Sequence, residues 1–316
     1  MEGIRTALAF SPSTAATEVT PPAKRVFRVT ELDDYLACPY DYYVKHVLGI
    51  APLEEVTEDI SPLARGSKVH AVLRQFYEEW KGPVTAEKED KARELLRSLA
   101  VRAFQNEADT FRNRREKELF LLVMAERFLD AEKEFWKHGF TPAYLELSIE
   151  SFQLPLPDET VVEIHAKVDR IDVDDKGNFM IVDYKTGAYP LPRTGLEQEI
   201  FQLPVYAVMA MTAESSEDMP LLKRAIGLVY YDLAGKYKGA ARDVVLFNAD
   251  VLKDQPTTKP RSSPKSSGEF EEILRRSMDK ARQAVEGILS GDFLSRPQDE
   301  KKCRYCQNKT MCRREP

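Results

Sequence analysis

The chain has 316 residues, of which 43% are hydrophobic, enough to bury the core of one large domain or two small ones. No stretch approaches the roughly 20 consecutive apolar residues of a membrane helix, and residues 1–23 lack the pattern of a secretory signal peptide. We therefore expect a soluble cytoplasmic protein without membrane contact. The formal net charge of −6 excludes a uniformly basic protein, so a nucleic-acid partner would have to meet local basic surface.

Helices are predicted over most of the first 138 residues, after a disordered arm at 1–25 that is rich in Ser, Thr, Ala and Pro. Short helices are predicted at 30–36 and 40–47, and an amphipathic helix at 61–80 carries His70 at the edge of its apolar stripe. The helical spacing of residues 85–138, with one break at 109–113, predicts two long helices that form an insertion at about 83–140.

Three strands are predicted next, at 144–152, 161–173 and 179–185, with residues 174–178 as the turn between the last two. In the second strand the apolar positions change parity after Val168, which indicates a bulge or a sharp twist at Asp169.

A further helix is predicted at 195–212, where a spacing of four places Gln198, Gln202 and Tyr206 on one face and Pro204 is expected to bend the helix. Strands at 224–233 and 243–247, a linker at 253–268 and a helix at 269–289 follow. The order helix, three strands, helix, strand predicts an α/β fold with a mixed sheet.

The triplet Asp183-Tyr184-Lys185 ends an apolar strand, and strand alternation places its Asp and Lys side chains on one face. A carboxylate there can hold a hard divalent cation, while the ammonium group can hold a water molecule or neutralise charge on a phosphate. The hairpin is expected to bring Asp169 beside Asp183. A structural ion pair is the alternative interpretation, and His70 can be either a nitrogen ligand or a satisfied core residue.

The four cysteines of the chain can form one metal site, because Cys303, Cys306 and Cys312 cluster within ten residues and Cys38 stands near the other end. Four thiolates suffice for zinc or for an iron-sulfur cluster, whereas disulfides are not expected in an intracellular protein. The spacing alone favours zinc, the commoner metal of small four-cysteine sites.

From Val26 onward the chain resembles the RecB/AddB-type branch of the PD-(D/E)XK nuclease superfamily, whose fold has a restriction-endonuclease-like core. The resemblance rests on six segments in the order of the family: Thr30-Glu31-Leu32 with Tyr35 and Cys38-Pro39; Arg65-Gly66-Ser67-Lys68-Val69-His70; Val168-Asp169-Arg170-Ile171-Asp172; Ile181-Val182-Asp183-Tyr184-Lys185-Thr186-Gly187; Gln202-Leu203-Pro204-Val205-Tyr206; and Cys303-x2-Cys306-x5-Cys312.

The resemblance implies roles for individual residues of this chain. His70, Asp169, Asp183 and the backbone carbonyl of Tyr184 would bind Mg²⁺ or Mn²⁺, and Lys185 would assist the attacking water. The implied substrate-binding residues are Gln202 and Tyr206, and the implied ligands of a [4Fe-4S] cluster are Cys38, Cys303, Cys306 and Cys312. The family usually has glycine where this chain has Ala166, whose methyl group could narrow the approach of DNA.

The implied function is a metal-dependent DNA nuclease, expected to be an exonuclease on single-stranded or unwound ends in DNA repair and recombination. Related domains work beside a helicase or in CRISPR adaptation, and these 316 residues contain no GxxxxGK[ST] phosphate loop, so we expect a separate helicase subunit. The alternative from another functional class is a non-catalytic DNA-binding or scaffold module of a helicase-nuclease complex.

Overall fold

A computed structural model describes residues 25–51, 58–136, 139–186, 200–212, 222–233, 243–252 and 263–312. The expected disordered arm therefore lies, apart from Arg25, outside the described residues, as do Gln198 and most of the expected linker. None of the described helices is long and apolar enough to cross a membrane.

The centre of the fold is a mixed sheet with the order β1-β3-β4-β5-β6-β7, in which β2 also pairs with β3. The long strands β2 (Thr141–Pro155) and β3 (Val161–Val173) are antiparallel, as are β3 and β4 (Asn178–Lys185). Strand β5 (Arg224–Asp232) runs parallel to β4, and β6 (Asp243–Asn248) is antiparallel to β5. The short strands β1 (Val26–Arg28) and β7 (Ser263–Lys265) pair in parallel with β3 and β6.

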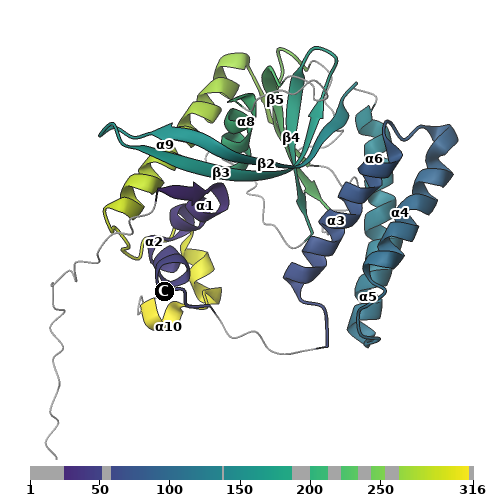
Figure 1. Cartoon of the computed structure of the whole chain (residues 1–316), viewed down its shortest axis with the longest axis horizontal. Helices are drawn as coiled ribbons and strands as arrows, with labels where there is room; N and C mark the ends of the chain where they lie inside the picture. The colour runs from purple at the N-terminus through teal and green to yellow at the C-terminus, as the bar shows by residue number, and fades with distance from the viewer. Residues whose placement is uncertain are drawn as a thin grey trace, which may run out of the picture.

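One face of the sheet is covered by helices from the first half of the chain (Figure 1). These are α3 (Pro62–Trp80), α4 (Glu89–Ala103), α5 (Phe111–Leu119), the π-helical segment η3 (Phe120–Met124) and α6 (Ala125–Trp136), with the short turn η2 (Ala86–Lys88) before α4. Their apolar side chains share a core with the side chains of β4 and β5 that point to this face, among them Val182 and Tyr231. This is the helical layer of the fold.

The other face carries α1 (Val29–Ala37), α8 (Gln202–Thr212) and α9 (Ser267–Leu289), which share a second core with Ile164, Ile181 and Leu228 of the sheet. The chain continues from α1 into α2 (Pro39–Tyr42) and the π-helical η1 (Tyr43–Val47). After α9 come η4 (Glu300–Tyr305) and α10 (Lys309–Cys312), so the segments from both ends of the chain lie together beside α1 and α2 (Figure 1).

The α/β class, the mixed sheet and the order helix, three strands, helix, strand are confirmed by α3, β2, β3, β4, α8 and β5. The break between the long helices lies at residues 104–110, a few residues before the expected 109–113, because α4 ends at Ala103 and a continuous helical stretch begins at Phe111. Pro204 does not bend α8, since it stands in the first helical turn, where its missing N–H is not needed. The end of the expected linker instead forms β7 and the Ser266 cap of α9.

The ribbon formed by β2 and β3 changes its buried face next to Asp169. Val168 packs with the core of α1, α8 and α9, whereas the next alternate residue, Arg170, bonds to side chains of the helical layer. The pairs Leu145 with Arg170 and Leu147 with Val168 show no change of register here, and the residue between them on β2, Glu146, has a left-handed φ of 52°. The expected feature at Asp169 is thus a twist shared by both strands rather than a bulge.

Candidate metal centre

The N-terminal part of α3 lies unusually close to the end of β4, and Gly66 makes this approach possible. A Cβ at Gly66 would lie 3.2 Å from Oγ1 of Thr186, tighter than ordinary van der Waals contact. Arg65 fixes the same contact, because its Nη2 donates to the Thr186 carbonyl at 3.0 Å. One helical turn further, His70 is therefore held over the backbone of Tyr184.

His70, Asp169 and the backbone of Tyr184 form a compact group. The Nε2 atom of His70 lies 3.1 Å from the Tyr184 carbonyl oxygen, and its Nδ1 atom lies 3.4 Å from Oδ1 of Asp169. The Tyr184 N–H donates to Oδ2 of Asp169 at 2.9 Å. Both ring nitrogens thus face oxygen acceptors, an arrangement that suits an imidazolium or, in its place, a cation bound between the same atoms.

The electrostatics of His70 agree with this arrangement. Burial lowers the pKa of His70, but the hydrogen bond and the charge of Asp169, together with the charges of Asp183 and Glu146, outweigh burial and raise it. Three carboxylates therefore direct negative potential at one point, which is where a divalent cation would be stabilised.

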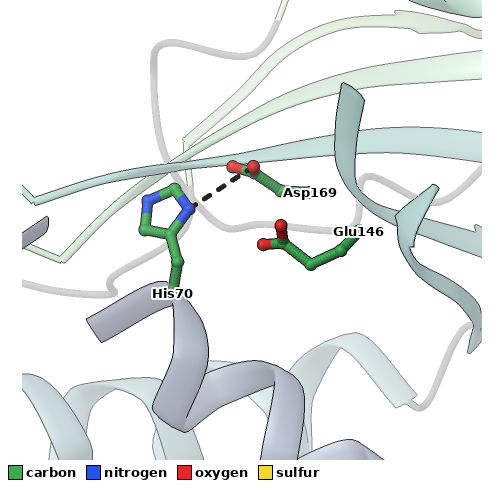
Figure 2. Close-up of side chains that lie close together, drawn as sticks. All are labelled: His70, Glu146 and Asp169. Atoms are coloured by element: carbon green, nitrogen blue, oxygen red, sulfur yellow. Dashed lines mark ion pairs between the residues drawn. The ribbon is translucent and has the colours of Figure 1, made fainter. Parts of the chain in front are cut away.

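Glu146 of β2 is a further member of this group that sequence reasoning missed. Ligand atoms of His70, Glu146 and Asp169 all lie within 4.8 Å of one another, and their side chains point toward a common space (Figure 2). The left-handed backbone of Glu146, a conformation that costs a non-glycine residue about 1 to 3 kcal/mol, is typical of functional sites. Glu146 also forms an ion pair with Lys167 of β3.

Asp183 and Lys185 lie next to this group at the end of β4. Lys185 Nζ is 2.6 Å from Oδ2 of Asp183 and 5.1 Å from the ring centroid of Tyr230. Burial raises the pKa of Asp183 to about 6; the Lys185 ammonium opposes this rise, and the Asp169 carboxylate adds to it. The carboxyl group is thus poorly solvated and close to two other charged groups of the centre.

A cleft of about 530 Å³ opens onto the group. His70, Glu146 and Asp169 contribute to its walls, together with Arg74 and Lys167. A second cavity of about 250 Å³ is lined by β3 residues that precede Asp169, among them His165 and Lys167, so Lys167 borders both cavities. The metal group is therefore accessible to a substrate.

The two residues expected on the substrate side have different surroundings. Gln202 donates to Oδ2 of Asp33 on α1 at 2.8 Å, so its amide is engaged within the protein. Tyr206 is buried and borders the second cavity. Burial is the main cause that raises the pKa of Tyr206, and the charge of Asp183 adds to it. Ala166 packs in the core of α1, α8 and α9 and borders this second cavity, so its methyl group does not narrow the cleft at Asp169.

Beneath the centre, the fully buried Arg170 joins β3 and β4 to the helical layer. Its guanidinium donates to Glu132 of α6 at 2.9 Å and to Asp172 at 2.5 and 2.7 Å. It also donates to the hydroxyl groups of Tyr77 on α3 at 3.0 Å and of Tyr184 at 3.2 Å. This Arg170 network fixes α3, and with it His70, relative to the two strands that carry Asp169 and Asp183.

The cysteines lie where the two ends of the chain meet. Cys38, Cys303 and Cys306 border a cavity of about 410 Å³, and Cys312 lies apart from its wall, with its Sγ 3.0 Å from Oγ of Ser295. The described residues include no group of three thiols within 4.8 Å of one another.

The chain is similar to an ATP-dependent helicase/deoxyribonuclease subunit from Clostridium acetobutylicum, with 22% identity over 90% of this chain and 29% of the relative. The corresponding protein of Streptococcus uberis is 28% identical over 57% of this chain and 16% of the relative, so the chain spans less than a third of either protein. The solved structure of the protein SSO0001 matches 87% of this chain and 93% of its own chain, with 13% identity and a TM-score of 0.25.

Nearly the whole chain matches the model of one protein family. The model of the PD-(D/E)XK nuclease superfamily matches residues 27–313, which include the metal group, Lys185 and all four cysteines. The chain thus belongs to the PD-(D/E)XK nuclease superfamily.

Proposed function

We propose that this chain is a metal-dependent DNA nuclease that hydrolyses phosphodiester bonds, acting as an exonuclease on single-stranded or unwound ends. The observation that carries the proposal is the convergence of His70 and Asp169 on the backbone of Tyr184, beside the Asp183–Lys185 pair. Membership of the nuclease superfamily and the deoxyribonuclease relatives support the same reaction and the same substrate.

The donor set fits Mg²⁺ or Mn²⁺. Oxygen atoms of Asp169, Asp183 and the Tyr184 carbonyl, with one imidazole nitrogen of His70, are the ligands that such hard cations accept. Glu146 is the additional oxygen donor within reach. A bound ion would lower the pKa of a water molecule and shield the charge of the phosphate.

Lys185 is the proposed catalytic cation. Its ammonium group is held at 2.6 Å by Asp183, on the same strand face, so it lies beside the carboxylate that would bind the metal. From there it can hold the attacking water and stabilise the negative charge that grows on the phosphate as the bond to the sugar oxygen breaks. Asp169 and His70 of α3 would supply ligands on the other side of the proposed metal ion.

The cysteines are proposed to hold a [4Fe-4S] cluster, with zinc as the alternative metal. Support comes from the cavity that Cys38, Cys303 and Cys306 share, and from the short α10, which carries Cys312 just after them in the chain. The cluster would clasp the two ends of the chain, which already meet through the bond from Gln298 N–H to the Ala37 carbonyl at 2.9 Å. The helicase named in the relatives suggests that the nuclease acts beside such a motor in DNA repair and recombination.

The test is cleavage of linear single-stranded DNA with Mg²⁺ or Mn²⁺ and with a chelator. We expect metal-dependent cleavage by the wild type and none by Asp169→Asn, whereas Lys176→Ala should stay active. Lys176→Ala is the matched control for Lys185→Ala, which should lose most of the activity, because Asp174-Asp175-Lys176 repeats the Asp-x-Lys spacing in an exposed turn. Circular DNA that resists digestion would identify an exonuclease. If the protein binds the DNA but cleaves it with neither Mg²⁺ nor Mn²⁺, the proposal is overturned in favour of a scaffold.

A further inference from the structure

The metal group contains one carboxylate that already has another partner. Glu146 lies within ligand distance of His70 and Asp169, yet it also forms an ion pair with Lys167. The Glu146 side chain is 16% exposed, whereas that of Lys167 is 63% exposed. The lysine therefore reaches from solvent to a carboxylate at the edge of the metal group.

Lys167 lies between the cleft of the metal group and the second cavity. Lys167 borders the cleft that holds Asp169 and also the second cavity, where Arg28 and His165 lie. His165, Lys167 and Asp169 are alternate residues of β3, so they follow one another at about 6.8 Å along the strand. Such a spacing is comparable with successive phosphates of an extended single strand.

We propose that Lys167 binds the phosphate next to the one that is cleaved, and that metal binding releases Lys167 for this role by drawing Glu146 away from it. The inference rests on the proposed nuclease function. A cation bound by His70 and Asp169 competes with the lysine for the Glu146 carboxylate, because a carboxylate that binds a divalent cation gives up negative charge to it and attracts the ammonium group less strongly. Loss of the ion pair leaves an exposed ammonium group between the two cavities, where a polyanionic strand gains from it.

A negatively charged strand would then pass from the second cavity over Lys167 to Asp169. Metal loading and substrate affinity are thereby linked: the protein binds the strand more tightly when the metal that cleaves it is present.

The experiment measures the affinity for a short fluorescent oligothymidine as a function of salt, first in chelator and then in Ca²⁺, with the DNA checked for integrity after each titration. The variants are Lys167→Gln, Glu146→Gln and the double variant, and Lys176→Gln is the matched control for loss of one exposed lysine charge. Melting curves verify that each variant is folded.

In Ca²⁺, Lys167→Gln should bind more weakly than Lys176→Gln, and the slope of log K against log salt should be shallower by about 0.7, the value for one lost contact to a single strand. In chelator, Lys167→Gln should match the control, because in the metal-free wild type Lys167 is paired with Glu146 and makes no contact with DNA that the substitution could remove. Glu146→Gln should bind DNA more tightly than the wild type in chelator, and the double variant should lose this gain. Mn²⁺ should bind Lys167→Gln more tightly than the wild type.

An unchanged slope for Lys167→Gln in Ca²⁺, or no gain for Glu146→Gln in chelator, would overturn the inference while leaving the nuclease proposal intact. A wild-type protein that binds no DNA in either condition and cleaves none with Mg²⁺ or Mn²⁺ would overturn both.

Discussion

Replacing Asp183 by asparagine should stabilise the metal-free protein, although it removes a proposed catalytic residue. At neutral pH the wild type holds a carboxylate whose burial, with the charge of Asp169 nearby, raises its pKa from 3.8 to about 6. At a pH above both values, that rise corresponds to about 3 kcal/mol of lost stability. For 316 residues this equals about 4 to 5 °C in melting temperature, and the value already includes the opposing attraction of Lys185.

The assay is thermal unfolding in chelator over a range of pH, with the exposed turn variant Asp175→Asn as control. Because the pKa of Asp183 is raised in the folded state, the wild type gains stability as the pH falls through about 6, and the advantage of Asp183→Asn disappears toward 3.8. Excess Mg²⁺ or Mn²⁺ should reverse the order, because an ion at about one thousand times its dissociation constant adds about 4.1 kcal/mol to the wild type, more than the loss of about 3 kcal/mol.

A metal-free Asp183→Asn protein that melts below the wild type at neutral pH would refute this reasoning. It would mean that the ion pair with Lys185 stabilises the fold more than burial of the carboxylate destabilises it. A stability difference that does not change between neutral and acidic pH would show that Asp183 does not titrate in this region.

Three further results are expected. Lys185→Ala should lower the cleavage rate by about 10² to 10³-fold while DNA binding in a gel-shift assay persists, because the ammonium acts on the transition state; a rate near wild type would exclude this role. The apparent affinity for Mn²⁺, measured by calorimetry, should fall as the pH drops through about 6, because Asp183 then takes up a proton in competition with the metal. The raised pKa of His70 makes its protonation compete already at higher pH, and a flat profile would remove both residues from the ligand set. Cys38→Ser should lose iron and acid-labile sulfide in elemental analysis and should melt at a lower temperature. The loss in free energy of unfolding should be at most the roughly 5 to 6 kcal/mol that a cross-link over this loop provides. Full metal content in this variant would show that Cys38 is not a ligand.

Much of the centre was predictable because its residues lie in short segments with a fixed geometry. The spacing of Asp183 and Lys185 on one strand predicts their common face, and the tight hairpin after Val173 places Asp169 beside them. His70 follows from the helical pattern of α3 and from the family resemblance, which together place it over β4.

Glu146 could not be predicted in the same way. Its place opposite Asp169 depends on the register of β2 against β3, which two bulges in β2 alter, and its backbone takes a left-handed conformation that no local residue pattern announces. Gln202 illustrates the same limit, because its partner Asp33 comes from a helix 169 residues earlier in the chain. Such contacts are set by packing of distant segments rather than by periodicity.

The Arg170 network has a consequence for any attempt to shorten this protein. Glu132 reaches Arg170 from α6, a helix that contributes no residue to the metal group itself. A shortened version that kept the sheet, α3 and both ends of the chain would leave the Arg170 guanidinium buried in an apolar interior without Glu132, one of its two carboxylate partners. The helical layer is therefore a structural prerequisite of the centre, and a minimal nuclease cut from this chain would have to replace Arg170 and Asp172 together with apolar residues.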